Sequence, residues 1–281
     1  MSRCSAAPGE RGREVIGVFP DIHFPHQDAE ALRCALRLFA YVGVDRVLIL
    51  GDACDVGSFN AHGKTPGDYA EDYLDVEVEQ ARALLDVLES ILGVREIVYV
   101  EGNHEARVAR WLAANGAPAS LERLVAPKAL LSEGRRSRFT WVDYFPAPER
   151  DAFVEVAPGL VACHGWTHAT HAAAKHLDIA RGYSVVHGHT HRAQRYVARS
   201  PVTGAPLEAW SPGTLARLRP TWAHGKPTSW THGVSLIHTW RRGSETRWRE
   251  TTHTIHQGEI VSPCGTVIPA GADGSVIAGV A

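Results

Sequence analysis

The stretch that decides the fold is Val47-Leu48-Ile49-Leu50-Gly51-Asp52-Ala53-Cys54-Asp55. Its four leading apolar residues do not alternate with polar ones, which is typical of a parallel strand covered on both faces. Gly51 then lets the backbone turn, so that Asp52 and Asp55 arrive at the carboxyl end of the strand, where open α/β sheets place their ligands. Alone, Asp52 would be interpreted as a capping residue. A carboxylate here can also bridge two metal ions, and the other motifs of the chain favour that interpretation.

The composition is that of an ordinary globular protein. With 281 residues, of which 44% are hydrophobic, the chain allows one large or two small domains with a sizeable core. The net charge of -2 argues against a strongly basic nucleic-acid surface. No apolar run approaches the length needed to cross a bilayer, and residues 1–13 lack the apolar core of a signal peptide. We therefore expect a cytoplasmic protein with no membrane partner.

Cysteine and histidine usage points to metal chemistry without thiolates. The five cysteines include no Cys-x-x-Cys pair, so neither a disulfide framework nor a structural zinc knuckle is indicated. Cys54 and Cys163 each stand beside a candidate ligand, and we expect both to be small buried thiols. The chain has 16 histidines, and histidine is the commonest metal ligand among side chains.

The N-terminal part of the chain predicts a β-α-β unit. The apolar run at residues 14–20 ends in Asp21-x-His23, and two residues with this spacing at a strand end project to the same side. A polar turn is the alternative interpretation of this pair. Asp28 is suited to cap a helix over residues 29–42, and a right-handed crossover to the next strand is expected.

The next motif follows a long helix predicted over residues 69–92 and a strand over 96–100. This strand ends in Gly-Asn103-His104-Glu. An Asn carbonyl is a hard oxygen donor suited to a divalent ion. His104 would be either a ligand or an acid–base group, and Arg107 would face either an anion or solvent.

Two segments are expected to shape a substrate cleft. Residues 57–67 form a polar loop that leaves the same strand end as Asp52, and its His62 is either a substrate contact or a solvated residue. Residues 111–150 contain no ligand candidates and are interpreted as an insertion with a helical part and a short strand. An insertion over the site would select the substrate.

The second half of the chain again places donors at strand ends. A hairpin over residues 152–163 leads into His164, and a strand at 184–186 leads into Gly-His189-Thr-His191, whose two imidazoles point to one side. Three further histidines, in a stretch that is expected to become helix, are placed at the pocket rim or the surface rather than among the ligands: His168, His171 and His176.

We predict one domain over residues 1–262, in which two β-rich halves face each other with helices outside. Residues 263–281 are rich in Gly, Ala and Pro and are expected to form a flexible tail or a partner-docking arm. The oxygen and nitrogen donors at strand ends are too many for one ion and suit two ions that share a carboxylate. Donors without thiolate favour Mn, Fe, Zn, Ni or Co, and two such ions about 3.5–4 Å apart form a clamp for in-line displacement at phosphorus. These donors are Asp21, His23, Asp52, Asn103, His164, His189 and His191.

The order of the motifs resembles that of the calcineurin-like metallophosphoesterases. Asp-x-His, Gly-Asp-x-x-Asp, Gly-Asn-His-Glu, a lone His and Gly-His-x-His occur in that order across residues 21–191. The resemblance implies a four-layer α/β/β/α sandwich with a two-metal site. It also implies that one ion is held by Asp21, His23 and His191, the other by Asn103, His164 and His189, and that Asp52 bridges them.

The resemblance implies further roles beside the metals. His104 would contact the scissile phosphate and assist the leaving group, and Asp55 would orient His104. Protein serine/threonine phosphatases have Arg where this chain has Val56, which argues against phosphoprotein substrates. The Gly-Asn-His-Glu form and the stretch at residues 210–215 are more similar to uncharacterised bacterial and phage members of the family.

The sequence thus predicts a phosphodiesterase or phosphatase that uses two divalent ions, manganese among the candidates. It would hydrolyse a small phosphodiester or phosphomonoester by in-line attack of a metal-bridging hydroxide. The alternative is a nuclease that uses the same centre on DNA or RNA, which the near-neutral charge disfavours. A non-catalytic scaffold is less favoured still, because no ligand is missing. The native metals, the substrate and the oligomeric state stay open.

Overall fold

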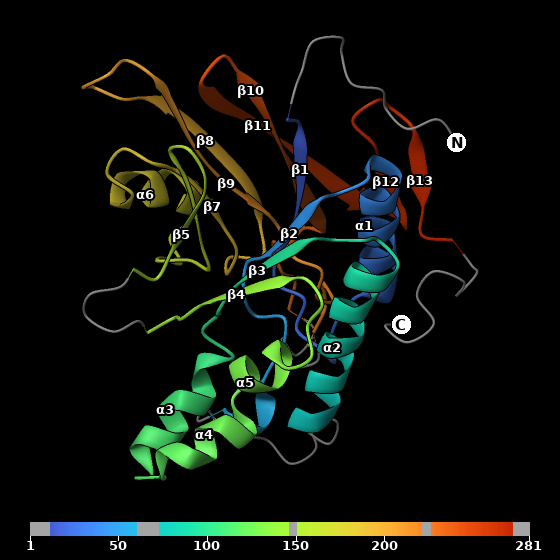
Figure 1. Cartoon of the computed structure of the whole chain (residues 1–281), viewed down its shortest axis with the longest axis vertical. Helices are drawn as coiled ribbons and strands as arrows, with labels where there is room; N and C mark the ends of the chain where they lie inside the picture. The colour runs from blue at the N-terminus through green and yellow to red at the C-terminus, as the bar shows by residue number, and fades with distance from the viewer. Residues whose placement is uncertain (1–11, 61–72, 146–150, 221–225, 272–281) are drawn as a thin grey trace.

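Eight strands of the described chain form the larger of two β-sheets (Figure 1). The computed structural model describes residues 12–60, 73–145, 151–220 and 226–271. The sheet order is β13-β12-β11-β10-β1-β2-β3-β4. Its parallel strands are β1 (Glu14–Phe19), β2 (Arg46–Ile49), β3 (Glu96–Val100) and β4 (Arg138–Val142). Its antiparallel strands are β10 (Gly233–Arg242), β11 (Glu245–His256), β12 (Glu259–Val261) and β13 (Val267–Pro269).

The smaller sheet has five strands in the order β5-β6-β7-β9-β8. Its central strands run parallel, whereas the two outer strands pair antiparallel with their neighbours. The strands are β5 (Val154–Ala157), β6 (Leu160–Cys163), β7 (Ser184–His187), β8 (Ala193–Arg199) and β9 (Pro206–Pro212).

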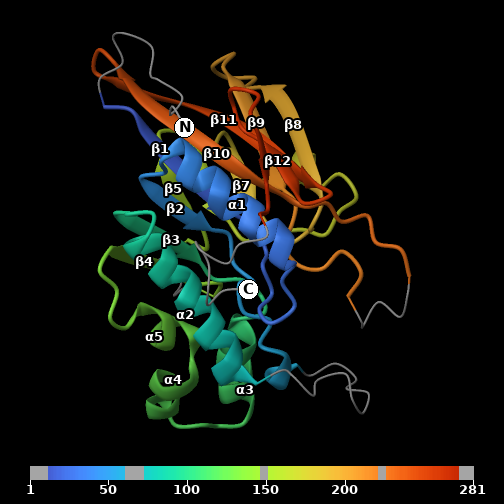
Figure 2. The same ribbon diagram turned by 90° about the vertical axis from the view of Figure 1, so that its right-hand side faces the viewer.

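Helices cover the outer faces of both sheets, which gives four layers in the order α/β/β/α (Figures 1 and 2). Asp28 caps α1 as expected, because its carboxylate accepts a 2.9 Å hydrogen bond from the amide of Ala31. Helices α1 and α2 lie against the larger sheet, and α6 lies against the smaller one. The helices are α1 (Ala29–Val42), α2 (Leu74–Ser90), α3 (Ala106–Ala114), α4 (Ala119–Val125), α5 (Pro127–Ser132), α6 (Ala172–Ile179) and a 3₁₀ turn, η1 (Gly57–Phe59).

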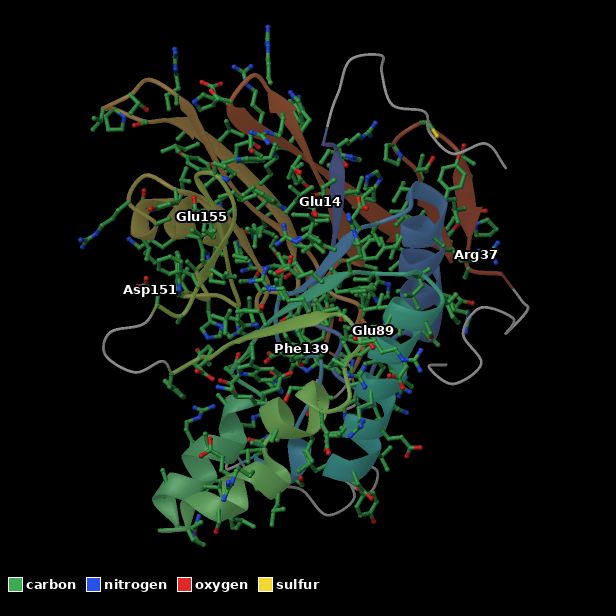
Figure 3. The ribbon with its side chains drawn as sticks, in the orientation of Figure 1. Glu14, Arg37, Glu89, Phe139, Asp151 and Glu155 are labelled. Carbon is green, nitrogen blue, oxygen red and sulfur yellow. The ribbon has the colours of Figure 1, made fainter. Side chains whose placement is uncertain are left out.

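The alternation of side chains along β1 explains why two cores form. Ile16 and Val18 point into the core between the two sheets, whereas Val15 and Phe19 point into the core beneath the helices. Figure 3 shows side chains filling the space between the sheets, and its labelled Phe139, on β4, packs against the helix-side core. Two hydrophobic faces per strand require cover on both sides, and this is what the unbroken apolar run at residues 47–50 predicted.

Two expectations about chain organisation are corrected. The segment 263–281 is not wholly a tail, because Val267–Pro269 is strand β13 at the edge of the larger sheet. Within the expected insertion at 111–150, Arg138–Val142 is β4 and pairs in parallel with β3, while α5 packs against α2 and β4. This segment is therefore mainly part of the scaffold, and only its end reaches the site.

Other expectations hold or lie outside the described residues. Cys54 and Cys163 are fully buried free thiols, as predicted. His62 and residues 69–72 of the expected helix fall in a range that the structure does not describe. Among the described helices, none has the length and apolar character to cross a bilayer.

Candidate metal centre

The site forms where the carboxyl ends of parallel strands from both sheets meet. From the larger sheet, β1 is followed by Asp21 and His23, β2 by Asp52, and β3 by Asn103. From the smaller sheet, β6 is followed by His164 and β7 by His189 and His191. Because the sheets pack face to face, donors far apart in sequence converge at one edge of the sandwich.

The first group of donors is Asp21, His23 and His191, whose ligand atoms lie within 4.8 Å of one another. The Nε2 atoms of His23 and His191 are 3.1 Å apart, and Nε2 of His191 is 3.2 Å from Oδ1 of Asp21. Nδ1 of His23 donates to Asp55 at 2.7 Å, which leaves Nε2 of neutral His23 with its lone pair. Lone pairs and a carboxylate facing one point favour a cation there.

The second group is Asn103, His164 and His189, joined by Asp52. Nε2 of His164 lies 2.9 Å from Oδ1 of Asn103, 3.0 Å from Nδ1 of His189 and 3.2 Å from Oδ2 of Asp52. Nδ1 of His164 donates to the carbonyl of Leu50 at 2.7 Å. This bond occupies Nδ1 and leaves Nε2 as the ring nitrogen that faces the site, the arrangement usual for metal-binding histidines.

Asp52 stands between the two groups. Its Oδ2 is 3.8 Å from Nε2 of His23 and 3.2 Å from Nε2 of His164, while its Oδ1 accepts a 2.9 Å hydrogen bond from the amide of His104. The side chain is buried, so one oxygen faces both donor groups and the other is held by the backbone. This donor set fits two divalent cations that share one carboxylate.

The backbone at the site is strained. Positive φ angles occur at His23 (57°), Asp52 (49°), His189 (69°) and His191 (56°). Non-glycine residues in the left-handed region cost roughly 1–2 kcal/mol each and persist where the surroundings over-determine them. Four such residues in one donor set indicate that the fold holds these side chains in imposed positions, as functional sites do.

Gly102 is required for space rather than only for the turn that the sequence indicated. A Cβ at this position would lie 2.0 Å from Oδ1 of Asp52 and 2.3 Å from its backbone nitrogen. Gly188 has the same role beside the first group, because its Cβ would lie 2.6 Å from Oδ2 of Asp21. Because glycine has no side chain, the carboxylates of Asp52 and Asp21 can occupy the space beside Gly102 and Gly188.

The electrostatics of the protein alone already favour charge separation at the site. Burial opposes ionisation of Asp52, but the positive charges of His104 and His164 hold its pKa well below the usual range. Burial likewise opposes protonation of His164, yet the carboxylate of Asp52 raises its pKa to about 10. Protons on histidines thus neutralise buried carboxylates, and cations bound there would take over that role.

His104 lies beside the donors with its own partners. Its Nδ1 is 3.1 Å from Oδ1 and 2.9 Å from the carbonyl oxygen of Asp55, and its Nε2 is 3.7 Å from Oδ2 of Asp52. Burial would lower the pKa of His104, but the carboxylates of Asp52 and Asp55 raise it. Arg107 donates to the carbonyl of Asp55 at 2.7 Å and places Nη2 3.0 Å from Nε2 of His104. The expected pairing of Asp55 with His104 is present, and Asp55 also holds His23.

A cavity of about 330 Å³ opens over both donor groups. His104 and His168 lie in its wall, together with Arg192 and Trp230. His168 is therefore at the rim, as expected, with Nε2 2.8 Å from Nε2 of His189. His176 is not at the rim or surface: it is fully buried, because helix α6 turns it toward the smaller sheet.

Two buried glutamates at the site were not assigned roles from the sequence. Glu105 accepts hydrogen bonds from three backbone amides in the ligand turns and from the hydroxyl of Tyr99. Glu77 accepts from the amides of Val56 and Gly57. The signal for Glu77 was a carboxylate on the apolar face of its helix, and for Glu105 an acidic residue directly after a strand-end motif.

No comparison with known proteins assigns this chain to a family. No family model matches the chain, and no curated protein matches its sequence. Among solved structures, Vps29 of Chaetomium thermophilum has 14% identity and a TM-score of 0.38, covering 92% of this chain and 100% of its own. Vps29 of Cryptosporidium parvum has 13% identity and a TM-score of 0.38, covering 86% and 99%. A zinc complex of Vps29 from Entamoeba histolytica has 13% identity and a TM-score of 0.37, covering 85% and 98%.

Proposed function

We propose that this chain is a calcineurin-like metallophosphoesterase that hydrolyses a phosphodiester or a small phosphomonoester with two divalent cations. The observation that carries the proposal is the position of Asp52, whose single Oδ2 faces donors from both sheets. The five ordered motifs, each at a strand end, support it.

The donor set supports a borderline divalent metal. Carboxylate, amide and imidazole groups suit Mn, Fe, Zn, Ni or Co. Burial raises the pKa of both nearby thiols, Cys54 and Cys163, so they stay protonated and are poor ligands. Bound in this site, two such ions would supply an activated water near neutral pH and positive charge for the phosphoryl oxygens.

The protein side chains would do the remaining work. His104 faces the cavity over the donors, and the carboxylates of Asp52 and Asp55 raise its pKa, which favours the protonated form that a general acid for the leaving oxygen needs. Asp55 orients the ring through Nδ1. Arg107, whose guanidinium touches the same imidazole, would help to hold the substrate anion.

Metal-dependent turnover tests the proposal directly. The chain is stripped with a chelator, loaded separately with Mn, Ni, Co or Zn, and assayed with a chromogenic aryl phosphodiester and its monoester. We expect turnover with at least one metal, and about two ions per chain by elemental analysis. Absence of turnover on both esters with every metal would contradict the proposal.

Two variants separate metal binding from acid catalysis. His104→Ala is expected to lower kcat roughly 10²- to 10⁴-fold while the metal content stays the same. Asp52→Ala is expected to lose bound metal, because it removes the oxygen that both groups share. His171→Ala, an exposed histidine, is the control and should change neither quantity. Loss of metal from His104→Ala would show that this residue is structural instead.

The nuclease alternative has one supporting observation. Arg107 touches His104, Arg110 donates to the carbonyl of Asn103 at 2.8 Å, and Arg192 lies in the cavity wall. These guanidinium groups suit a polyanion. Binding of an oligonucleotide that weakens steeply with salt, together with its cleavage, would favour this alternative over a small substrate.

A further inference from the structure

A second cavity of about 310 Å³ adjoins the metal centre. It shares His168 and His189 with the cavity over the donors and extends to Tyr144, Trp166 and Thr167. His104 lines the first cavity but not the second. A phosphate held at the metal centre could therefore project one ester arm past His104 and the other into this second cavity.

In the wall of the second cavity, Trp166 packs against two other rings. The amide of Trp166 donates to Nε2 of the buried His176 at 2.9 Å, and the two rings stack with centroids 5.6 Å apart. Phe153 meets the indole edge-on at 6.1 Å. Trp166 is half-buried and lines the cavity. Such a fixed ring binds a ligand with little loss of side-chain entropy.

Tyr144 supplies a second ring from another part of the chain. It lies in the segment after β4, and its amide donates to the half-buried carboxylate of Glu101 at 2.8 Å. Phe145 packs edge-on against the ring at 4.8 Å, and the ring of His164 lies 6.1 Å away. Two half-buried aromatic side chains thus line one cavity next to a donor of the metal centre.

We propose that this cavity is a subsite for a flat heteroaromatic ring, such as a nucleobase, on the ester arm that stays bound to phosphorus. The inference rests on the proposed function and narrows its substrate class to nucleoside phosphodiesters. In the reaction, a water oxygen joins phosphorus and releases one proton to solvent, the bond to the leaving oxygen breaks, and that oxygen takes a proton from His104, which solvent then replaces. The nucleoside then leaves as its monophosphate. Stacking on Trp166 and Tyr144 accepts any base, because every base has a π-face.

Two substrates with the same leaving group isolate the subsite. The metal-loaded chain is assayed with thymidine 5′-(4-nitrophenyl phosphate) and with methyl 4-nitrophenyl phosphate, which differ only in the retained arm. Stacking on an aromatic side chain is worth about 1–3 kcal/mol per base, so kcat/KM should favour the nucleoside ester at least about fivefold. Equal kcat/KM values for the two esters would overturn the inference while leaving the proposed function intact.

Variants of residues in each cavity test whether the preference for the nucleoside ester arises in the second cavity. Trp166→Leu and Tyr144→Leu, from separate segments, should each lower the preference for the nucleoside ester and change kcat/KM for the methyl ester less than about twofold. Trp230→Leu is the control, because this ring meets His191 and lines the cavity over the donors but not the second cavity. Its preference ratio should match that of the unmodified chain. An unchanged ratio in both cavity variants would overturn the inference.

Binding provides a readout that does not depend on turnover. Calorimetry compares thymidine 5′-monophosphate with methyl phosphate on the metal-loaded chain and on Trp166→Leu. We expect the nucleotide to bind at least about fivefold more tightly, and the variant to lose that advantage. If no ester is hydrolysed but this difference is seen, the proposed function fails and the subsite stands. If the two ligands bind equally, the subsite is refuted whatever the activity.

Discussion

Glu105 braces both ligand turns although its side chain is almost completely buried. Its carboxylate accepts hydrogen bonds of 3.0 Å from the amides of Asp52, Cys54 and Gly102, and one of 2.6 Å from the hydroxyl of Tyr99. Burial and the neighbouring Asp52 raise its pKa. One acidic side chain thus links the turn after β2 to the turn after β3. This link fixes the distance between the donors on the two turns.

Glu105→Gln is predicted to weaken metal binding without removing any ligand. The amide group keeps the size of the side chain but replaces one of the two accepting oxygens with an NH2 group, which points N–H donors at backbone N–H donors. Changes behind metal ligands typically cost 10–100-fold in affinity, so we expect about that loss in a metal titration. The thermal midpoint should also fall. Glu122→Gln on the exposed face of α4 is the matched control. Unchanged metal affinity in Glu105→Gln would refute the bracing role.

At the scale of elements, α6 is joined to β7 through two stacked histidines. The rings of His176 and His187 lie 3.7 Å apart at 7° and are fully buried. Nδ1 of His176 donates to the carbonyl of Ala172 at 2.8 Å, and Nε2 accepts from Trp166. This neutral tautomer is fully satisfied, and burial lowers the pKa of His176 to about 4.

A pH-dependent stability follows from this packing. Between about pH 6.5 and 4 the unfolded chain binds a proton at His176 that the folded chain does not, so the free energy of unfolding falls as the pH falls. From about pH 7 to pH 5 this residue should account for roughly 2 kcal/mol of lost stability. Urea unfolding of the metal-free chain and of His176→Gln measures it. The variant should lose about that much less stability on acidification, and parallel pH profiles would contradict the assignment.

At the scale of the whole molecule, the two donor groups depend on how the sheets pack. Asp21, His23, Asp52 and Asn103 follow strands of the larger sheet, whereas His164, His189 and His191 follow strands of the smaller one. The core between the sheets holds these halves in register, and Trp210 is its largest fully buried side chain. Damage to that core should therefore move donors relative to one another even when no ligand is altered.

Ile237→Ala tests this dependence, because Ile237 lies in the core between the sheets on β10, which carries no donor. We expect a loss of about 2–5 kcal/mol in the free energy of unfolding, together with weaker metal binding. Leu36→Ala, in the core beneath α1, is the control with a similar stability cost but little effect on metal affinity of the folded chain. Equal effects of both variants on metal affinity would refute the coupling between sheet packing and the site.

Much of the predicted fold and site followed from patterns among residues that are close in sequence. The capping of α1 by Asp28 and the covered strand before Gly51 depend on neighbours in sequence, and both appear in the structure. The donors after strand ends were found for the same reason, since parallel strands of a sheet end on one side. By contrast, the burial of His176 and the pairing of β13 depend on contacts with segments that periodicity does not identify.

The amino-acid sequence by itself determined the order of elements from β1 to β3 and the list of candidate donors, because apolar periodicity and turn residues act over a few positions. Only the tertiary structure decided which donors share a site, that Asp52 lies between two groups, and that Glu105 braces the turns. The contacts behind these features span 29 positions between His23 and Asp52, 53 between Asp52 and Glu105, and 168 between His23 and His191. Their distances are set by the packing of two sheets against each other, and no local pattern of residues encodes that packing.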